Sequence, residues 1–253
     1  MFRALPVFAA LFFSAHANAE EIRVAVASNF AAPMQKIVAQ FEIDTGHKVS
    51  VSLGATGRFY SQIRHGAPFE MLLAADEETP ARLEKEGLAI AGSRFTYSIG
   101  KLVLWSAKPG FVDDKGEVLR KGNFTHLSVA NPRLAPYGAA AVESMKALGV
   151  LESVQPKFVQ AENIAQAFQF VASGNAQLGF VAMSQVYENG KLKSGSAWLV
   201  PASFHSPIRQ DAVILQKGRN KPAVESFARF LKSEPARQLI RQYGYAVTSA
   251  SAG

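Results

Sequence analysis

Short apolar segments alternate with amphipathic segments along the whole chain, and this alternation is the strongest constraint on its fold. A chain that alternates strands with helices folds as an α/β protein, in which helices cover parallel sheets through right-handed crossovers. We expect strands at Ile22–Ala27, Val49–Leu53, Met71–Ala75, Lys101–Trp105, Leu127–Ala130, Leu178–Val181 and Ala212–Leu215.

The segments between these strands carry the apolar period of helices. Within residues 34–41, four apolar side chains recur at i, i+3, i+4 and i+7, which places them on one face. The same spacing recurs over residues 164–171 and 224–231. Thr79-Pro80 predicts a further helix start, with Thr79 as the N-cap and Pro80 at the first helical position.

Residues 1–19 have the order of parts found in a secretory signal peptide. Arg3 supplies the positive end, residues 4–13 form an apolar run, and Ala17-Asn18-Ala19 has the A-x-A cleavage pattern. The apolar run is too short for a transmembrane helix, which needs about 20 residues. We therefore expect a cleaved signal peptide and a mature protein in the periplasm. An N-terminal core helix is the alternative.

Composition excludes several kinds of site. The chain of 253 residues contains no cysteine, which excludes disulfides, zinc–thiolate sites, iron–sulfur clusters and cysteine nucleophiles. Hydrophobic residues make up 48% and charged residues 19%, a balance that supports a buried core. Lys and Arg outnumber Asp and Glu by 27 to 20, but the basic residues are scattered. That distribution favours solvated surface charge over nucleic-acid binding.

No motif in the sequence favours an enzyme. None of the histidines lies four residues from another, so the chain has no helical pair of metal ligands. It also lacks the nucleophile elbow G-x-S-x-G, a Walker loop and the dinucleotide-binding motif G-x-G-x-x-G. Because catalytic groups can come from distant parts of a chain, an exported hydrolase or transferase stays open as an alternative.

Small and hydroxyl-bearing residues follow several expected strands, where a helix is about to begin. A helix N-terminus carries unpaired backbone N–H groups and about half a unit of positive charge, and Ser or Thr hydroxyls add donors. Ends that converge form a site for a small dianion, whereas each junction alone is explained by ordinary capping. The junctions are Ala27-Ser28-Asn29, Gly54-Ala55-Thr56-Gly57, Asn131-Pro132 with Pro136-Tyr137-Gly138, and Glu162-Asn163-Ile164.

These junctions and several neighbouring segments resemble the periplasmic molybdate-binding proteins of ABC importers. The similarity runs in order over essentially the whole chain after residue 19. Its more specific parts are Gln62-Ile63-x-x-Gly66-Ala67-Pro68-Phe69 and Ala74-Ala75-Asp76. Its weaker parts are Val24-Ala25-Val26-Ala27-Ser28-Asn29-Phe30, Gly54-Ala55-Thr56-Gly57, Pro136-Tyr137-Gly138, Ala161-Glu162-Asn163-Ile164, Leu178-Gly179-Phe180-Val181 and Tyr243-Gly244-Tyr245.

The resemblance implies an α/β protein with the type II periplasmic binding fold, in which two lobes joined by two crossing strands close on a tetrahedral oxyanion. The extended segments 98–105 and 203–215 are the expected crossings. We therefore expect residues 20–101 and 208–253 to form the first lobe and residues 102–207 to form the second.

The resemblance also implies which residues bind the anion. Ser28 and Thr56 correspond to the two hydroxyl residues of the first lobe that donate to it. Asn29 corresponds to a position whose backbone or side chain contributes in part of the family. Tyr137 and Ile164 correspond to positions of the second lobe that contribute mainly through backbone N–H groups.

One departure from the family and two arginines bear on this set of donors. Some members carry, at the position of Ala182, a tyrosine whose hydroxyl reaches the ligand. We expect Asn29 or the Tyr137 end of its helix to replace that donor. Arg58 and Arg209 could form bidentate pairs with an anion, but salt bridges at the surface or between the lobes are the favoured interpretation.

The function implied by the resemblance is capture of molybdate, or of tungstate, for an ABC permease in the inner membrane. The protein would act as a monomer without a cofactor, and neutral donors would replace the hydration shell of the dianion. A rigid ring of donors would discriminate against smaller sulfate by size and against protonated phosphate by its extra proton. The alternatives are a binding protein for sulfate, phosphate or an organic anion, an exported hydrolase, and an exported sensor or adhesion module.

Overall fold

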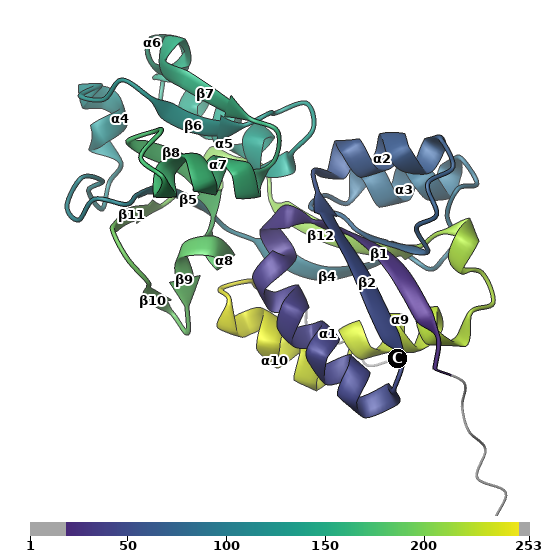
Figure 1. Cartoon of the computed structure of the whole chain (residues 1–253). Coiled ribbons are helices and arrows are strands. Elements are labelled where there is room, and N and C mark those ends of the chain that lie inside the picture. The colour runs from purple at the N-terminus through teal and green to yellow at the C-terminus, as the bar shows by residue number, and fades with distance from the viewer. Residues whose placement is uncertain (1–18, 248–253) are drawn as a thin grey trace, which may run out of the picture.

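The computed structural model describes residues 19–247 and contains two five-stranded sheets, each packed against helices (Figure 1). Figure 1 shows the two sheets in separate bodies that lie side by side and are joined by β4, β5 and β12. The signal peptide expected at residues 1–19 lies outside the described residues except for Ala19.

The first sheet has the strand order β2-β1-β3-β12-β4. Buried side chains lie on both of its faces, and α1, α9 and α10 cover one face while α2 and α3 cover the other (Figure 1). Its elements are β1 (Glu21–Ala27), η1 (Ser28–Phe30), α1 (Ala31–Thr45), β2 (Lys48–Gly54), α2 (Thr56–Arg64), β3 (Met71–Leu73), α3 (Glu78–Lys85), β4 (Phe95–Gly100), β12 (Ile208–Ile214), η4 (Gln216–Gly218), α9 (Pro222–Leu231) and α10 (Glu234–Gln242).

The second sheet has the strand order β11-β5-β8-β6-β7, and α5 and α7 pack on it. A two-stranded hairpin of β9 and β10 follows the short helix α8. The elements are β5 (Leu102–Ser106), α4 (Glu117–Lys121), β6 (Leu127–Ala130), α5 (Pro136–Ala147), α6 (Leu151–Val154), η2 (Gln155–Lys157), β7 (Phe158–Ala161), α7 (Ile164–Ala172), β8 (Leu178–Ala182), α8 (Met183–Val186), β9 (Tyr187–Glu188), β10 (Lys191–Leu192), β11 (Ser196–Leu199) and η3 (Ala202–Phe204).

The expectation of wholly parallel sheets is wrong for the strands that join the two bodies. β1 pairs in parallel with β2 and β3, and β6 pairs in parallel with β7 and β8. β12, however, runs antiparallel to β3 and β4, and β5 runs antiparallel to β8 and β11. β4 leads into β5, and β11 into β12, without an α-helix between them. Each of these steps passes from one sheet to the other, so β5 and β12 enter their sheets from the opposite body and not by a crossover helix from a neighbouring strand.

The connections between the two sheets are short. A single residue, Lys101, separates β4 from β5, and residues 200–207 connect β11 with β12. We propose on this basis that residues 20–101 and 208–253 form the first lobe and that residues 102–207 form the second, with residues 248–253 beyond the described part of the chain.

The helices predicted over residues 34–41, 164–171 and 224–231 are confirmed as parts of α1, α7 and α9. In each of them the periodic apolar side chains face a core, as the i, i+3, i+4 spacing requires. Within residues 19–247, no helix combines the length and apolar character needed to cross a membrane.

The predicted cap at the start of α3 is wrong. The helix begins at Glu78, one residue before Thr79, and its flanking residue makes no side-chain cap. The Asp76 carboxylate accepts the Thr79 backbone N–H at 2.8 Å instead, and the Thr79 hydroxyl donates to the same carboxylate at 3.2 Å. A carboxylate complements the positive end of a helix better than a hydroxyl does, so Asp76 takes the role that the sequence pattern assigned to Thr79.

The start of α5 lies directly against the end of β6. A Cβ atom placed on Gly138 would lie 2.1 Å from the backbone oxygen of Ala130. Only a residue without a side chain lets the helix approach the strand this closely, and the approach fixes where the first turn of α5 points.

Replacement of Gly138 by alanine should therefore move α5 or strain β6. We expect the variant to be less stable by about 1–3 kcal/mol, the usual cost of overpacking, with a lower Tm in thermal unfolding. Ala139→Ser, one position along and only half-buried, serves as the control. Equal Tm values for the two variants would show that the close approach does not constrain the helix.

Candidate anion-binding site

A small cavity lies between the two lobes, where the helix starts of both sheets meet. Its volume is about 10 Å³, about the space that one water molecule needs, so it is too small for an organic ligand. None of the residues that line it carries a charge. They are Ala27, Ser28, Asn29, Gly54, Ala55, Thr56, Ala75, Ala135, Pro136, Tyr137, Asn163 and Ile164.

The parallel register of the first sheet places Ser28 and Thr56 at this cavity. The last residues of β1 and β2, Ala27 and Gly54, are directly paired, so the residues that follow them leave the sheet at the same edge. Both hydroxyl side chains are almost fully buried, with exposed fractions of 5% for Ser28 and 1% for Thr56. Buried hydroxyls at the carboxyl edge of parallel strands are well placed to bind a ligand there.

The hydroxyl of Thr56 is oriented by a backbone group. Its Oγ1 accepts the N–H of Ala75 at 2.9 Å, so its own proton is free to donate elsewhere. The next residue, Gly57, donates its backbone N–H to the oxygen of Leu134 at 2.9 Å. This backbone bond joins the start of α2 in the first lobe to the loop before α5 in the second.

Ser28 contacts the start of α7 across the cleft. Its hydroxyl donates to Asn163 Oδ1 at 3.2 Å, and its oxygen accepts the Ala165 N–H at 3.4 Å. Asn163 is the N-cap of α7, and its side chain also accepts from the N–H groups of Ala165 and Gln166, each at 3.0 Å. The cap satisfies these two N–H groups but not the N–H of Ile164, the first residue of the helix, which lines the cavity.

Tyr137 and Ile164 line the cavity from the second lobe, at the starts of two helices. Tyr137 follows Pro136 in the first turn of α5, and Ile164 opens α7. N–H groups in the first turn of a helix have no carbonyl partner within the helix and carry its positive end charge. Two helix starts that face one cavity therefore create positive potential without a charged side chain.

Asn29 is buried and is held by a polar network. Its Nδ2 donates to Gln210 Oε1 at 2.8 Å and to the hydroxyl of Tyr245 at 2.9 Å. Its backbone oxygen accepts from the hydroxyls of Ser184 and Tyr245, both at 2.8 Å. Burial raises the pKa of Tyr245 to about 12, so this phenol keeps its proton across the physiological pH range.

Ala182 lies at the end of β8 and is fully buried. Its backbone N–H donates to Gln185 Oε1 at 2.8 Å, and no hydroxyl extends from this position. The hydroxyls of Ser184 and Tyr245 lie 3.0 Å apart, and both contact the backbone oxygen of Asn29. The tyrosine that some family members carry at this position thus has no direct counterpart here, and hydroxyls from α8 and the C-terminal segment hold Asn29 instead.

Arg58 and Arg209 both form ion pairs outside the cavity. Arg58 Nε lies 3.0 Å from Glu162 Oε1 and so connects the two lobes. Arg209 Nε lies 3.0 Å from Glu77 Oε2, and its Nη2 donates to the Thr96 hydroxyl at 3.0 Å. These contacts agree with the salt-bridge interpretation of the two arginines.

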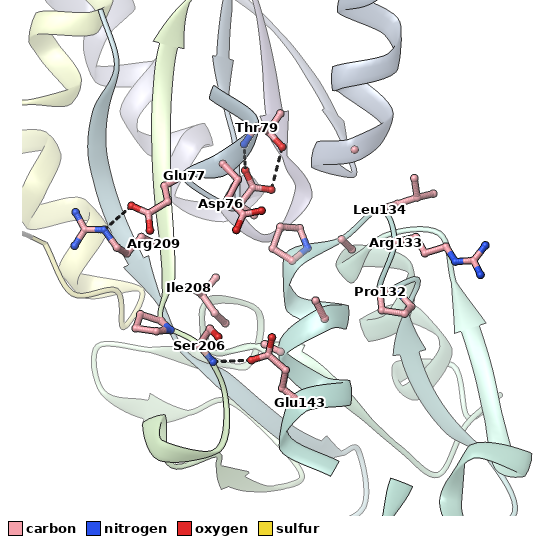
Figure 2. A pocket seen from close by; sticks show the side chains of 18 residues that line it. Asp76, Glu77, Thr79, Pro132, Arg133, Leu134, Glu143, Ser206, Ile208 and Arg209 are labelled. Atoms are coloured by element: carbon pink, nitrogen blue, oxygen red, sulfur yellow. Dashed lines mark hydrogen bonds and ion pairs between the residues drawn. The ribbon is translucent and has the colours of Figure 1, made fainter. Parts of the chain in front are cut away.

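A larger groove opens beside the cavity and shares Ala75, Ala135 and Pro136 with it (Figure 2). Figure 2 shows the side chains of Asp76 and Glu143 turned toward this groove from opposite lobes. Burial raises the pKa of Asp76 to about 6, although hydrogen bonds from Thr79 oppose the shift. Four acidic residues line the groove against two arginines, Arg133 and Arg209, so it is acidic in contrast to the uncharged cavity.

Sequence reasoning did not identify Gln210, Tyr245 and Ser184 as parts of the site. Tyr245 belongs to a segment that carries the family resemblance, and Gln210 lies in an expected crossing segment, but neither has a local pattern that marks it as polar and buried. Within residues 19–247, no group of three or more His, Asp or Glu side chains is arranged to hold a metal ion.

Comparisons with known proteins agree with this architecture. The family model described as bacterial extracellular solute-binding protein matches residues 22–246. The molybdate-binding protein ModA of Azotobacter vinelandii is 61% identical over 229 residues, which cover 90% of this chain and 91% of that protein. ModA of Rhodobacter capsulatus is 50% identical over 229 residues, covering 90% and 89% of the two chains.

A solved structure supports the same assignment. The structure of the Azotobacter vinelandii periplasmic molybdate-binding protein matches with a TM-score of 0.87 and 41% identity, covering 90% of this chain and 100% of that one. The match of the family model, the two relatives and the fold agree over nearly the whole of residues 19–247. The chain therefore belongs to the bacterial extracellular solute-binding proteins and, within them, to the family of the molybdate-binding proteins ModA.

Proposed function

We propose that this protein binds molybdate, and tungstate as an anion of similar size, and delivers it to an ABC permease of the inner membrane. The observation that carries the proposal is the cavity between the lobes, which is lined by hydroxyls and helix starts and by no charged side chain. The relatives that are 61% and 50% identical carry the name molybdate-binding protein. A cleaved signal peptide at residues 1–19 would place the mature monomer in the periplasm.

The proposed donors are Ser28, Asn29, Thr56, Tyr137 and Ile164. A dianion that enters the cavity loses its hydration shell, which is costly unless donors replace it. Hydrogen bonds to a charged acceptor contribute about 1.5–3 kcal/mol each, so five of them offset a large part of that cost. Because these donors are fixed by helices and strands, little reorganisation is needed when the anion binds.

Selectivity among oxyanions follows from the same arrangement. Donors fixed to two sheets cannot move inward to contact a smaller anion equally well, which disfavours sulfate. A phosphate that retains a proton presents a donor where the wall already consists of donors, and two facing donors cannot form a hydrogen bond. The proposed site needs neither a cofactor nor a nucleophile, so capture without chemical turnover is the function that we infer.

Release to a permease requires the lobes to separate. Contacts that join them close to the cavity include the Ser28–Asn163 hydrogen bond, the Gly57–Leu134 backbone bond and the Arg58–Glu162 ion pair. Rotation about the short crossings β4–β5 and β11–β12 would break these contacts and expose the anion. A permease that recognises the closed arrangement would then distinguish loaded from empty protein.

Calorimetric titration of the signal-free, ligand-stripped protein is the direct test. We expect binding of one molybdate per chain, with a similar response to tungstate and little response to sulfate or phosphate at the same concentrations. If sulfate or phosphate bound more tightly than molybdate, the protein would serve a different oxyanion. If none of the four anions bound, an organic anion or an exported hydrolase would have to be considered, and turnover of ester substrates would decide between them.

Thr56→Val should reduce molybdate affinity by roughly 10- to 100-fold, because it removes a hydroxyl that donates to a charged acceptor while keeping the size of the side chain. Thr45→Val is the matched control, since Thr45 donates to the Phe41 oxygen at the end of α1, away from the cavity. Titration of both variants measures the difference. Equal affinity for the two variants would remove Thr56 from the binding site.

Arg58→Gln should change molybdate affinity by less than about fivefold, since exposed ion pairs contribute about 0–1 kcal/mol and Arg58 is more than half exposed. Glu162→Gln removes the other partner of the pair and should have an effect of the same small size. A loss of a hundredfold or more in Arg58→Gln alone would instead identify Arg58 as a direct ligand of the anion.

A further inference from the structure

A buried polar network connects the proposed donor Asn29 to the second lobe, and Gln210 lies at its centre. Gln210 belongs to β12 and its side chain is fully buried. Its Oε1 accepts from Asn29 Nδ2 at 2.8 Å and from the Tyr97 hydroxyl at 3.0 Å. Its Nε2 donates to the Tyr137 hydroxyl at 3.1 Å. One side chain thus contacts a proposed donor residue from each lobe.

The place of Gln210 in the fold is a crossing strand. The pairing of β12 with β4 shifts register between Gln210 and Asp211, and the other crossing strand provides Gly100 beside the network. A Cβ atom on Gly100 would lie 2.1 Å from the Tyr137 hydroxyl oxygen and 2.6 Å from Gln210 Nε2. The Tyr137 hydroxyl and the Gln210 amide therefore occupy the space that a side chain at position 100 would fill.

Two features of the network show that its hydrogen bonds are incompletely matched. Asn29 Oδ1 is buried and has no hydrogen-bond partner within residues 19–247. The Tyr97 hydroxyl lies within bonding distance of two acceptors, Ala74 O at 2.9 Å and Gln210 Oε1 at 3.0 Å, but has one proton to give. A buried acceptor without a partner costs about 1–3 kcal/mol.

Both mismatches disappear if the amides of Asn29 and Gln210 turn by half a rotation together. Gln210 Nε2 then donates to Asn29 Oδ1 and to the Tyr97 hydroxyl, and Tyr97 gives its single proton to Ala74. The hydroxyl of Tyr137 donates to Gln210 Oε1. The hydroxyl of Tyr245 gives its single proton to Asn29 Oδ1 in place of the Asn29 backbone oxygen, which then accepts from Ser184 alone. The turned arrangement needs no movement of the backbone, because the oxygen and nitrogen of an amide occupy equivalent positions.

The turned arrangement leaves the Asn29 Nδ2 amide without a partner, in the position of the unpartnered oxygen. It also leaves the oxygens of Tyr245 and of the Asn29 backbone 2.8 Å apart without a proton between them. Asn29 lines the cavity, and an unpaired buried N–H group there needs an acceptor. An oxyanion supplies that acceptor, whereas an amide oxygen in the same place would repel it. A bound anion therefore favours the turned arrangement, in which Asn29 donates to it and Gln210 holds the Asn29 oxygen on the other side.

We propose that Gln210 is a positioning residue that holds the side-chain amide of Asn29 with its N–H toward the bound anion and ties this donor through Tyr137 to the second lobe. This inference rests on the proposed function, because it assigns the orientation of a donor in the same site. It adds that anion binding and lobe closure share one hydrogen-bonded chain, which crosses at the hinge.

A double-mutant cycle on molybdate affinity tests the proposal. Asn29→Ala and Gln210→Met should each weaken binding by about tenfold or more, and the double variant should bind about as well as Asn29→Ala alone, because Gln210 acts through Asn29. Gln216→Met is the matched control: Gln216 donates to Ala89 O at 3.1 Å near the far end of β12 and should leave affinity unchanged.

A spectroscopic readout separates positioning from a structural role. In the wild type, molybdate should shift the side-chain N–H resonances of Asn29 and slow their exchange with water, and Asn29→Ala identifies these resonances by their loss. Gln210→Met should abolish the shift while circular dichroism shows a folded protein. If Gln210→Met does not fold, Tyr137→Phe replaces it in the same cycle, since this variant removes the hydroxyl and keeps the backbone N–H at the cavity.

The failures of the two proposals are distinguishable. Wild-type protein that binds no molybdate overturns the proposed function and this inference together. Wild-type protein that binds molybdate, combined with additive losses in the cycle or an Asn29 resonance that molybdate leaves unchanged, overturns the role of Gln210 alone.

Discussion

The structure depends on the parallel register of strands whose carboxyl ends meet at the cleft. Because β1 and β2 end in register, Ser28 and Thr56 leave the first sheet together, and helices α5 and α7 start opposite them from the second. A small anion can be enclosed without a counter-charge only if several donors converge on it, since each contributes modestly. The two sheets supply that convergence, and the family membership of the chain agrees with a binding role.

The hydroxyl donors depend on second partners that set their direction. Thr56 accepts from the N–H of Ala75, two residues after the end of β3, and Ser28 is within reach of the Ala165 N–H of α7. A hydroxyl that accepts from a fixed backbone group has its proton turned away from that group. For Thr56 the backbone therefore turns the proton away from Ala75, whereas the Ser28 proton is directed to the Asn163 side chain.

The local parts of this arrangement could be predicted from sequence, and the long-range parts could not. Ser28, Thr56, Tyr137 and Ile164 stand at strand-to-helix junctions, a pattern within a few residues, and all four line the cavity. Gln210 reaches Asn29 across 181 positions of the chain, a pairing that no local spacing encodes. The antiparallel crossing strands were missed for a related reason. The alternation of strands and helices predicts crossovers within one sheet, and not strands that pass from one sheet to the other.

The single residue between β4 and β5 limits how the two lobes can move. A link of one residue spans only about 3.3–3.6 Å when extended, so the lobes cannot slide apart and must swing about a pivot near Lys101. Motion about a pivot is smallest beside it and grows with distance from it. The Gln210–Tyr137 contact lies against Gly100, next to that pivot, whereas the Arg58–Glu162 pair involves neither crossing strand. An opening rotation about this link would therefore separate the Arg58–Glu162 pair by more than it separates Gln210 from Tyr137.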